Sequence, residues 1–395
     1  MHPALSPLID QIRSAAADGR CLSIRGGGSK SFYGQVSHHD DWLDARTLSG
    51  IVSHEPSELC LTAWAGTPLA EVQAALQAHG QCLPFEPPHF GGQATVGGMV
   101  AAGLSGPSRA VVGSVRDFVL GIHLVNGQGE SLQFGGQVMK NVAGYDLSRA
   151  VAGSLGQLGL LTQVSLKVLP IAPATTTLQF TGLGQTDALT LLHRWGGQPL
   201  PMLASAWLID RTLQPAQAVL LVRLAGAKAA VEAAVPILQG DAQALGAAFS
   251  RLPADQAARD WDAHTQQHVP IFTPAPHPHD ALWRLSVAPT APASSDFETA
   301  CIEWQGGLRW VWAPAARASE LRAWAAQHGG HATLFRASPQ GGEADKAVGV
   351  FHPLGPTQAA LQERLRRAFD PHNVFHTGRL LPRSFHSHLA SVAKA

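Results

Sequence analysis

The chain has 395 residues, 45% of them hydrophobic and 14% charged, and its 28 lysines and arginines balance 28 aspartates and glutamates. That length allows two or three domains with cores of their own, and zero net charge gives no electrostatic reason to expect nucleic acid or an anionic membrane as a partner. No uncharged apolar stretch reaches the about 18 residues of a membrane span, and residues 1–18 predict a polar-flanked helix, not a signal peptide. We therefore expect a cytoplasmic protein.

Short strands alternate with short helices in the first part of the chain. Strands are predicted at residues 22–25, 59–64, 118–125, 130–134 and 159–169, and helices at residues 67–79 and 145–152. The pair Asn126-Gly127 predicts a hairpin, because both residues accept positive φ. The regular β-α-β rhythm of a doubly wound sheet is missing, so an α+β domain is favoured.

A mixed pattern follows in the second part. A strand is expected to begin at residues 175–177, with further strands at residues 206–209, 218–224, 283–287, 308–312 and 332–337. Helices are predicted at residues 227–238, 241–249, 318–328 and 357–369. Residues 1–172 hold 24 of the 40 glycines, whereas residues 173–395 hold eight of the ten tryptophans. We predict two domains with these bounds.

The four cysteines, Cys21, Cys60, Cys82 and Cys301, are widely scattered and form no C-x-x-C pair. This spacing predicts neither a disulfide framework nor a zinc or iron–sulfur site. Buried free thiols are the expected state, and we predict no metal site.

The first glycine-rich segment, R-G-G-G-S-K at residues 25–30, follows a predicted strand. Consecutive glycines let backbone N–H groups converge on an anion, to which Arg25, Ser29 and Lys30 add donors. A tight turn would use the same glycines. The frames of the nucleotide-hydrolysing P-loop and of the Rossmann turn are absent.

Two more segments are rich in small residues. Residues 91–106 are mostly glycine and alanine, and a helix opening at Thr95 would turn its amides toward a pyrophosphate. A close-packed helix crossing explains this composition equally well. Residues 153–160 place glycines where a strand begins, as close approach of a flat ring or of adenine would require. Two pyrophosphate-type segments in one domain favour a dinucleotide ligand.

Longer motifs carry a resemblance to a known family. The runs G-S-V-R-D-F-V-L-G (113–121), K-N-V-A-G-Y-D-L-S-R (140–149) and G-L-L-T-Q-V-S-L-K-V-L-P (159–170) resemble the FAD-binding domain of the vanillyl-alcohol oxidase, or PCMH, type. E-P-P-H-F-G (86–91), L-W-R (282–284), G-G-L-R-W (306–310), G-G-H-A-T-L-F (329–335) and F-D-P-H-N-V-F-H-T-G-R (369–379) are similar to the FAD-binding E subunits of bacterial glycolate oxidases. The resemblance covers nearly the whole chain.

The resemblance implies an α+β fold, in which a two-subdomain PCMH-type FAD-binding domain precedes an α+β cap domain with an antiparallel sheet. It implies non-covalent FAD, because Ser29 stands where members with covalently attached FAD carry a histidine. Carried over by position, the cofactor-binding residues are Arg25, Gly26, Gly27, Gly28, Ser29, Lys30, Thr95, Val96, Gly97, Gly98, Ala101, Ala102, Gly103, Ser105, Gly106, Gly153, Gly156, Gly159 and Leu160.

The resemblance also implies a subunit of a glycolate oxidase complex, which takes part in oxidising glycolate or a similar small 2-hydroxy acid to the 2-oxo acid. Because the chain lacks iron–sulfur ligands, electrons would leave through a catalytic flavoprotein subunit and an iron–sulfur subunit of the same complex. Attachment to the inner membrane through these partners stays open. So do two alternatives, an autonomous FAD-dependent 2-hydroxy-acid dehydrogenase and a non-catalytic scaffold subunit.

Two departures bear on catalysis. The related catalytic subunits carry an H-x-G-D-G-N-x-H segment that this chain lacks, and the tail reads H-T-G-R where N-P-G-R is common. His331, which follows two glycines, is the candidate proton acceptor, and Arg379 is the candidate clamp for a substrate carboxylate.

Nineteen histidines raise a metal hypothesis, because His264 and His268 have helical i,i+4 spacing and His277 and His279 are two residues apart. The second pair lies in a proline-rich stretch that is typical of an exposed loop. For both pairs we favour solvent-facing polar residues.

Overall fold

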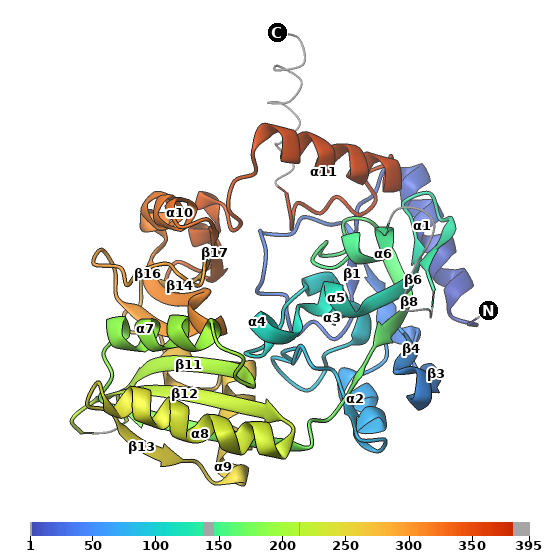
Figure 1. Ribbon diagram of the computed structural model, residues 1–395. Coiled ribbons are helices and arrows are strands. Elements are labelled where there is room, and N and C mark those ends of the chain that lie inside the picture. Colours follow the sequence, from blue (N-terminus) through green and yellow to red (C-terminus); the bar gives the residue numbers. More distant parts are fainter. Residues whose placement is uncertain (1, 137–145, 213, 382–395) are drawn as a thin grey trace.

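Two antiparallel sheets organise the fold, as the computed structural model shows for residues 2–136, 146–212 and 214–381 (Figure 1). The first sheet has five strands in the order β3-β4-β8-β6-β7, and the second has eight in the order β13-β10-β12-β11-β15-β16-β14-β17. This confirms the predicted α+β class and the antiparallel sheet of the cap. Among the described residues, no helix is both long and apolar enough to cross a membrane.

The elements of the first part are α1 (Leu5–Asp18), β1 (Leu22–Arg25), β2 (Asp41–Asp44), β3 (Ile51–Glu55), β4 (Cys60–Trp64), α2 (Leu69–Gln77), β5 (Gln81–Cys82), α3 (Val96–Ala102), α4 (Arg109–Val112), α5 (Val115–Phe118), β6 (Val119–Val125), β7 (Ser131–Gly135), α6 (Leu147–Ala150), β8 (Leu160–Lys167) and β9 (Leu169–Pro170). Strands β1 and β2 form a parallel pair, and β5 and β9 an antiparallel pair. The start of the predicted helix at Tyr145 lies outside the described residues.

The elements of the second part are β10 (Ala174–Thr181), α7 (Gln185–Gly196), β11 (Met202–Asp210), β12 (Gln217–Gly226), α8 (Lys228–Gln243), β13 (Ala248–Arg251), α9 (Ala254–Gln266), β14 (Asp280–Ser286), β15 (Thr299–Glu303), β16 (Leu308–Pro314), α10 (Ala318–Gln327), β17 (His331–Arg336) and α11 (Pro356–Phe369). Short 3₁₀ turns lie at Ala45–Thr47, Pro56–Glu58, Pro270–Phe272, Trp304–Gly306, Ala315–Arg317 and Gly342–Val348.

Strand β8 lies at the centre of the first sheet and is buried on both faces. Val164 and Leu166 belong to the hydrophobic core, where burying such a side chain contributes about 1.5–3 kcal/mol. Strict alternation predicts that Ser165 faces solvent, but Ser165 is buried, with its Oγ 2.8 Å from Oγ1 of Thr62 on β4. The partner hydroxyl supplies the hydrogen bond that a buried hydroxyl needs.

The predicted hairpin joins β6 to β7, with Val125 opposite Ser131. Its turn differs from the Asn-Gly expectation, because the left-handed residue is Gly129 at φ +73°. Asn126 Oδ1 accepts hydrogen bonds from the backbone N–H of Gln128 and of Glu130, both at 2.9 Å. The asparagine therefore shapes a longer loop through its side chain.

Helices α7, α8 and α10 cover one face of the cap sheet, and α9 lies on the other. Helices α7 and α8 pack on β10, β11 and β12, α10 packs on β14, β16 and β17, and α9 packs on β11 and β12. The predicted helix 241–249 is wrong, because α8 ends at Gln243 and β13 then joins β10. Gly246 leaves the helical conformation at φ +83°, and the rings of Phe249 and Phe180 lie 5.6 Å apart. Ring packing on the sheet edge outweighs helix propensity here.

The C-terminal segment returns to the first domain, as α11 does in Figure 1. Phe369 packs in the core of the first sheet, and Val374 and Phe375 pack with α1. Leu22 N–H donates to the Val374 carbonyl at 2.7 Å. The prediction assigned residues 173–395 to the cap, whereas these apolar side chains find their partners in the first domain. The boundary at residue 172 stays a prediction.

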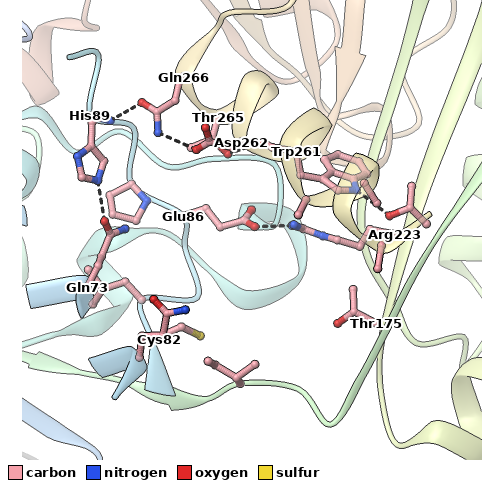
Figure 2. A pocket seen from close by; sticks show the side chains of 18 of the residues that line it. Gln73, Cys82, Glu86, His89, Thr175, Arg223, Trp261, Asp262, Thr265 and Gln266 are labelled. Atoms are coloured by element: carbon pink, nitrogen blue, oxygen red, sulfur yellow. Dashed lines mark hydrogen bonds and ion pairs between the residues drawn. The ribbon is translucent and has the colours of Figure 1, made fainter. Parts of the chain in front are cut away.

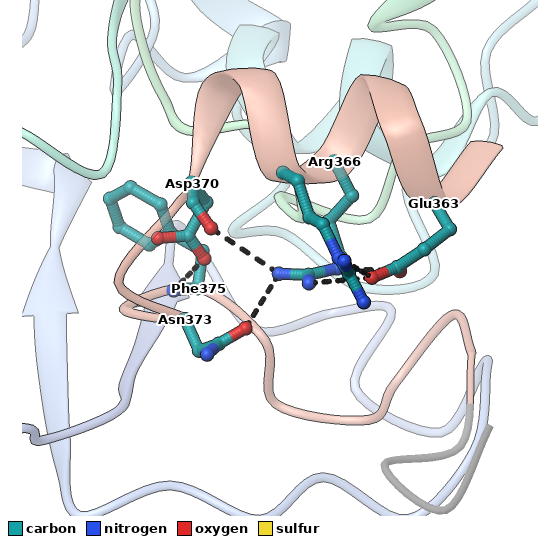
Figure 3. A network of polar contacts seen from close by, with 6 residues as sticks. Glu363, Arg366, Asp370, Asn373 and Phe375 are labelled. Atoms are coloured by element: carbon teal, nitrogen blue, oxygen red, sulfur yellow. Dashed lines mark hydrogen bonds and ion pairs between the residues drawn. The ribbon is translucent and has the colours of Figure 1, made fainter. Parts of the chain in front are cut away.

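A buried polar network holds the turn after α11 (Figure 3). The carboxylate of Asp370 accepts hydrogen bonds from the backbone N–H of Val374 and of Phe375, both at 2.8 Å. Arg366 is 2% exposed, and its guanidinium donates to both carboxylate oxygens of Glu363 at 2.9 Å. Its Nη1 also donates to Asn373 Oδ1 at 2.8 Å.

Replacing Arg366 by methionine is expected to lower the free energy of unfolding by about 3–5 kcal/mol, because it removes the buried guanidinium to which Glu363 and Asn373 are bound. The measurement is urea denaturation of both proteins. Arg367→Met is the matched control, because Arg367 donates to the same carboxylate at 2.6 Å with a side chain that is 64% exposed. The control loss is about 0–1 kcal/mol. Equal losses would contradict this account.

Candidate functional site

A cavity of about 470 Å³ opens between the loop after β1 and helix α3. This volume falls within the range of small-molecule and cofactor sites. The loop contributes its three consecutive glycines and α3 contributes Gly97 and Gly98, so much of the wall is bare backbone. The cap and the C-terminal tail close the cavity through Glu343, Lys346 and Arg379.

The glycines are required because two backbone segments touch. A Cβ on Gly27 would lie 1.4 Å from the Gln93 carbonyl oxygen, and a Cβ on Gly26 would lie 2.4 Å from Thr95 Oγ1. Gly28 has φ +72°, which disfavours residues with side chains. Close packing therefore explains these glycines, and the same glycines line the cavity; their role in binding an anion stays a prediction.

Thr95 sets the position of α3. Its Oγ1 accepts a hydrogen bond from the backbone N–H of Gly98 at 3.2 Å, as the N-cap residue of the helix. A Cβ on Gly97 would lie 2.8 Å from the Cβ of Ala65, so α3 also approaches the end of β4 closely. This proximity exposes the backbone of α3 to the cavity.

The cavity brings together most of the predicted cofactor-binding residues. Those that line it are Arg25, Gly26, Gly27, Gly28, Ser29, Lys30, Thr95, Gly97, Gly98, Ala101, Ala102, Gly156 and Gly159. Those that do not line it are Val96, Gly103, Ser105, Gly106, Gly153 and Leu160. Whether the lining residues contact a cofactor stays a prediction.

The predicted residues outside the cavity support its walls. Val96 and Leu160 are fully buried in two hydrophobic cores. A Cβ on Gly103 would lie 2.9 Å from the Cα of Gly153, so this pair lets two loops meet. The Gly106 carbonyl accepts a hydrogen bond from the indole of Trp304 in the cap at 3.0 Å. Ser105 Oγ accepts from the backbone N–H of Val115 at 3.3 Å.

Several lining residues were not predicted. Trp42 is 46% exposed, with the His39 ring 4.2 Å and the Arg25 guanidinium 5.3 Å from its ring. The sequence feature that could have pointed to Trp42 is the presence of a tryptophan in the glycine-rich part of the chain. Lys346 and Glu343 come from a 3₁₀ turn of the cap, and no local pattern in the sequence links that turn to the glycine loop.

The charge of the cavity favours an anion, because Arg25, Lys30, Lys346 and Arg379 line it against Glu343. Burial lowers the pKa of Lys30 to about 8. The Lys30 ammonium donates to Ser29 Oγ and to the His89 carbonyl, both at 3.3 Å. Burial also lowers the pKa of Lys346, with a further contribution from the Arg379 charge. An anionic ligand would offset the free-energy cost of burying the positive charges of Lys30 and Lys346.

Arg379 holds the glycine loop in place. Its guanidinium donates to the carbonyls of Lys30 at 2.5 Å and of Tyr33 at 3.1 Å, and burial lowers its pKa. Its own carbonyl accepts from the Gln35 N–H at 2.8 Å. The sequence suggested a clamp for a substrate carboxylate, whereas in the structure these donors are committed to the backbone.

His331 lies away from this cavity, at the exposed first position of the edge strand β17, opposite Ser286. Desolvation lowers its pKa, and the positive charges of Arg284, His352 and Arg109 lower it further. The guanidinium groups of Arg109 and Arg284 lie 4.4 Å and 4.9 Å from the Trp304 ring. His331 thus belongs to a second, cationic region, to which the cap contributes Arg284 and the first domain contributes Arg109.

A larger cavity of about 670 Å³ lies elsewhere between the domains (Figure 2). Glu86 and Arg223 form an ion pair across it at 2.6 Å, with Arg223 4.7 Å from the Trp261 ring. Arg223 is the only lysine or arginine among its lining residues, and Glu86 already neutralises it. No predicted cofactor-binding residue lines this cavity, so the smaller, glycine-walled cavity suits a pyrophosphate better.

The histidine pairs differ from each other. His277 and His279 are exposed, as expected of a proline-rich loop. The expectation for His264 is wrong, because its side chain is 1% exposed, whereas His268 is exposed. The inner face of α9 packs on the cap sheet and carries His264 into the interior.

Comparisons with known proteins support an FAD-binding domain in this chain. Residues 6–135 match the FAD binding domain family. The chain is 39% identical over 373 residues to the glycolate oxidase subunit GlcE of Escherichia coli K12, covering 94% of this chain and 96% of that protein. The prediction of an FAD-binding domain is confirmed by these matches.

Other relatives share part of the chain. A D-lactate dehydrogenase of Archaeoglobus fulgidus is 33% identical over 35% of this chain and 31% of its own length. Glycolate oxidase subunit GlcD of Bacillus subtilis is 30% identical over 33% of this chain and 28% of its own length. A solved alkyldihydroxyacetonephosphate synthase matches 95% of this chain and 76% of its own, with a TM-score of 0.67 and 15% identity, which shows a shared fold.

Gly27→Ala is expected to weaken FAD binding about 5- to 150-fold, because relieving the clash with the Gln93 carbonyl costs about 1–3 kcal/mol and shifts the loop. The measurement is a fluorescence titration of flavin-free protein with FAD. Gly92→Ala is the matched control, since a Cβ there meets nothing within 4 Å. Undiminished affinity in Gly27→Ala would show that the pyrophosphate lies elsewhere.

FAD affinity is expected to fall as the pH rises through about 8, where Lys30 loses its charge in the flavin-free protein. The limiting slope is about tenfold per pH unit. Lys30→Gln should flatten this dependence, and Lys228→Gln at the exposed start of α8 should leave it unchanged. Folding lowers the pKa of Lys30 from the ordinary 10.5 to about 8. Between these two pH values the unfolded chain holds the proton that the folded chain has lost, so the free energy of unfolding rises with pH. A slope retained in Lys30→Gln would assign the titration to another group.

Proposed function

Because the chain belongs to the family of glycolate oxidase subunit GlcE, we propose that it is the FAD-binding subunit of a glycolate oxidase complex. In that complex it takes part in oxidising glycolate or a similar small 2-hydroxy acid to the 2-oxo acid. The observation that carries the proposal is the cation-rich, glycine-walled cavity inside a domain that matches the FAD-binding family.

The residues of the cavity fit FAD by their chemistry. Bound FAD supplies an electron-accepting ring system, and the protein supplies binding and electrostatics. Gly26, Gly27 and Gly28 offer backbone N–H groups with no side chain in the way, and Arg25 and Lys30 offer positive charge for a pyrophosphate. Arg379 acts as a positioning residue, because it holds the loop through the carbonyls of Lys30 and Tyr33.

We infer that FAD is held without a covalent bond. Ser29 lines the cavity at the position where covalently flavinylated members of the family carry a histidine. A serine hydroxyl does not form that linkage. Acid precipitation of the purified protein is expected to leave the flavin in the supernatant, and flavin that stays with the precipitated chain would contradict this inference.

Electrons from the flavin are proposed to leave through partner subunits, one a catalytic flavoprotein and one an iron–sulfur protein. The cysteine spacing supports this route, because no two of the four cysteines stand in a cluster-binding motif. The absence of the H-x-G-D-G-N-x-H segment from this sequence also favours a relay role for the chain.

A second candidate, autonomous oxidation of a 2-hydroxy acid by this chain, is favoured by the cationic region around His331, between the cap and the first domain. Arg109 and Arg284 flank Trp304, and guanidinium groups pair with carboxylates in two-point geometry. The lowered pKa of His331 keeps its imidazole neutral near pH 7, so it could accept the alcohol proton. This region would then bind the substrate itself.

Anaerobic mixing with glycolate separates the candidates. The isolated, flavin-loaded chain is expected to keep its oxidised flavin absorbance, and adding the partner subunits should allow reduction. Reduction by the isolated chain would contradict the relay and support the autonomous enzyme. His331→Gln should then slow reduction, with His328→Gln as the control from the end of α10. A chain that neither carries nor takes up FAD would support a scaffold instead.

A further inference from the structure

We propose that His264, Cys301 and Glu303 form a binding site for one divalent metal ion of the zinc class. One ligand atom from each residue lies within 4.8 Å of the other two, and all three residues are buried. A nitrogen, a sulfur and an oxygen ligand together suit zinc and similar transition metals better than calcium or magnesium. This inference goes beyond the proposed function and does not depend on it.

The fold brings the three side chains together from two elements. Cys301 and Glu303 are two residues apart on β15, so they share one face of the cap sheet. Glu303 pairs with Ala206 on β11, and Ala206 packs with Trp261 of α9. Helix α9 therefore covers this face, and His264 in its last turn reaches the strand residues.

The His264 and Glu303 side chains face each other without a hydrogen bond. Nδ1 and Oε1 lie 3.3 Å apart, and neither atom has a hydrogen-bond partner among the described residues, although the side chains are only 1% and 6% exposed. Leaving such groups unsatisfied costs about 1–3 kcal/mol each. Two ligands of a tetrahedral zinc ion, each about 2.0–2.2 Å from it, are separated by about 3.3–3.6 Å. The observed separation thus matches a shared metal.

Cys301 supplies the third ligand. Its thiol is fully buried, and burial followed by the Glu303 charge raises its pKa well above the ordinary value. A bound divalent cation reverses this preference, because coordination stabilises the thiolate. The thiol proton passes to solvent as the Cys301 Sγ–metal bond forms. With thiolate and carboxylate, the dication is neutralised.

The surroundings orient the carboxylate. The indole N–H of Trp310 donates to Glu303 Oε2 at 2.8 Å, which leaves Oε1 turned toward His264. Outer hydrogen bonds of this kind fix the ligands of metal sites. The Glu303 charge also acts on Arg284, but the side chain of Arg284 forms its hydrogen bond with Tyr33. The lone pairs of Glu303 Oε1 are therefore available to a metal cation.

A small cavity offers a fourth coordination position. It has a volume of about 30 Å³ and is lined by His264 and Glu303, and by Gly106 of the first domain. That is enough for one water molecule. Three protein ligands with one open position is the arrangement of catalytic zinc sites, whereas structural sites use four protein ligands. The metal would therefore lie between the cap and the first domain.

Cobalt(II) is the probe, because it replaces zinc and reports a thiolate ligand by a near-ultraviolet charge-transfer band. The flavin-loaded full chain is treated with a chelator, dialysed and titrated with Co²⁺. We expect saturable binding of one ion with a thiolate band. Cys301→Ser should remove the band, and His264→Gln should weaken Co²⁺ binding at least about 100-fold, more than the loss of an outer hydrogen bond costs.

Matched controls use similar residues outside the site. His268→Gln changes an exposed histidine four residues beyond His264, and Cys21→Ser changes another buried thiol. Both should keep the band and the affinity. Flavin content per chain checks the folding of each variant, and if His264→Gln does not fold, loss of the band in Cys301→Ser decides.

Two results would overturn the proposal. One is no saturable Co²⁺ binding, which would leave His264 and Glu303 as a buried ion pair. The other is binding that Cys301→Ser and His264→Gln leave intact, which would mean an adventitious ion only. Because Co²⁺ binding is read independently of glycolate and of flavin reduction, a chain that takes no part in glycolate oxidation leaves this test unaffected.

Discussion

The contact of the Gly27 backbone with the Gln93 carbonyl is the constraint on which the rest of the first domain depends. No side chain fits between these segments, since a Cβ on Gly27 would lie 1.4 Å from that oxygen. The contact fixes the loop after β1 against the start of α3 and leaves backbone amides as the wall of the cavity. The same atoms thus provide stability and a surface suited to an anionic cofactor.

The C-terminal tail secures this contact from the other end of the chain. Arg379 donates to two carbonyls of the glycine loop and lines the same cavity. The network of Glu363, Arg366 and Asp370 holds the turn that aims the tail at the first domain. The position of the loop and the folding of the tail are therefore coupled, because loosening the tail frees the loop that lines the cavity.

Sequence patterns correctly predicted the elements whose formation depends on residues that are neighbours in the chain. The strands β1, β4 and β8, helix α2 and the glycine loop follow from apolar runs, helix signals and consecutive glycines. Contacts between distant segments were beyond such patterns, which is why β13 was taken for a helix and Lys346 was not linked to the cavity. His264 was placed in solvent because its neighbours on β15 lie more than 30 residues away.

The central claim is that FAD lies in the glycine-walled cavity. The most direct measurement is a crystal structure of the FAD-loaded chain. The account predicts pyrophosphate density beside the backbone of Gly26, Gly27 and Gly28, facing Gly97 and Gly98 of α3. Density for FAD in the larger cavity beside Arg223, with the glycine loop empty, would contradict it.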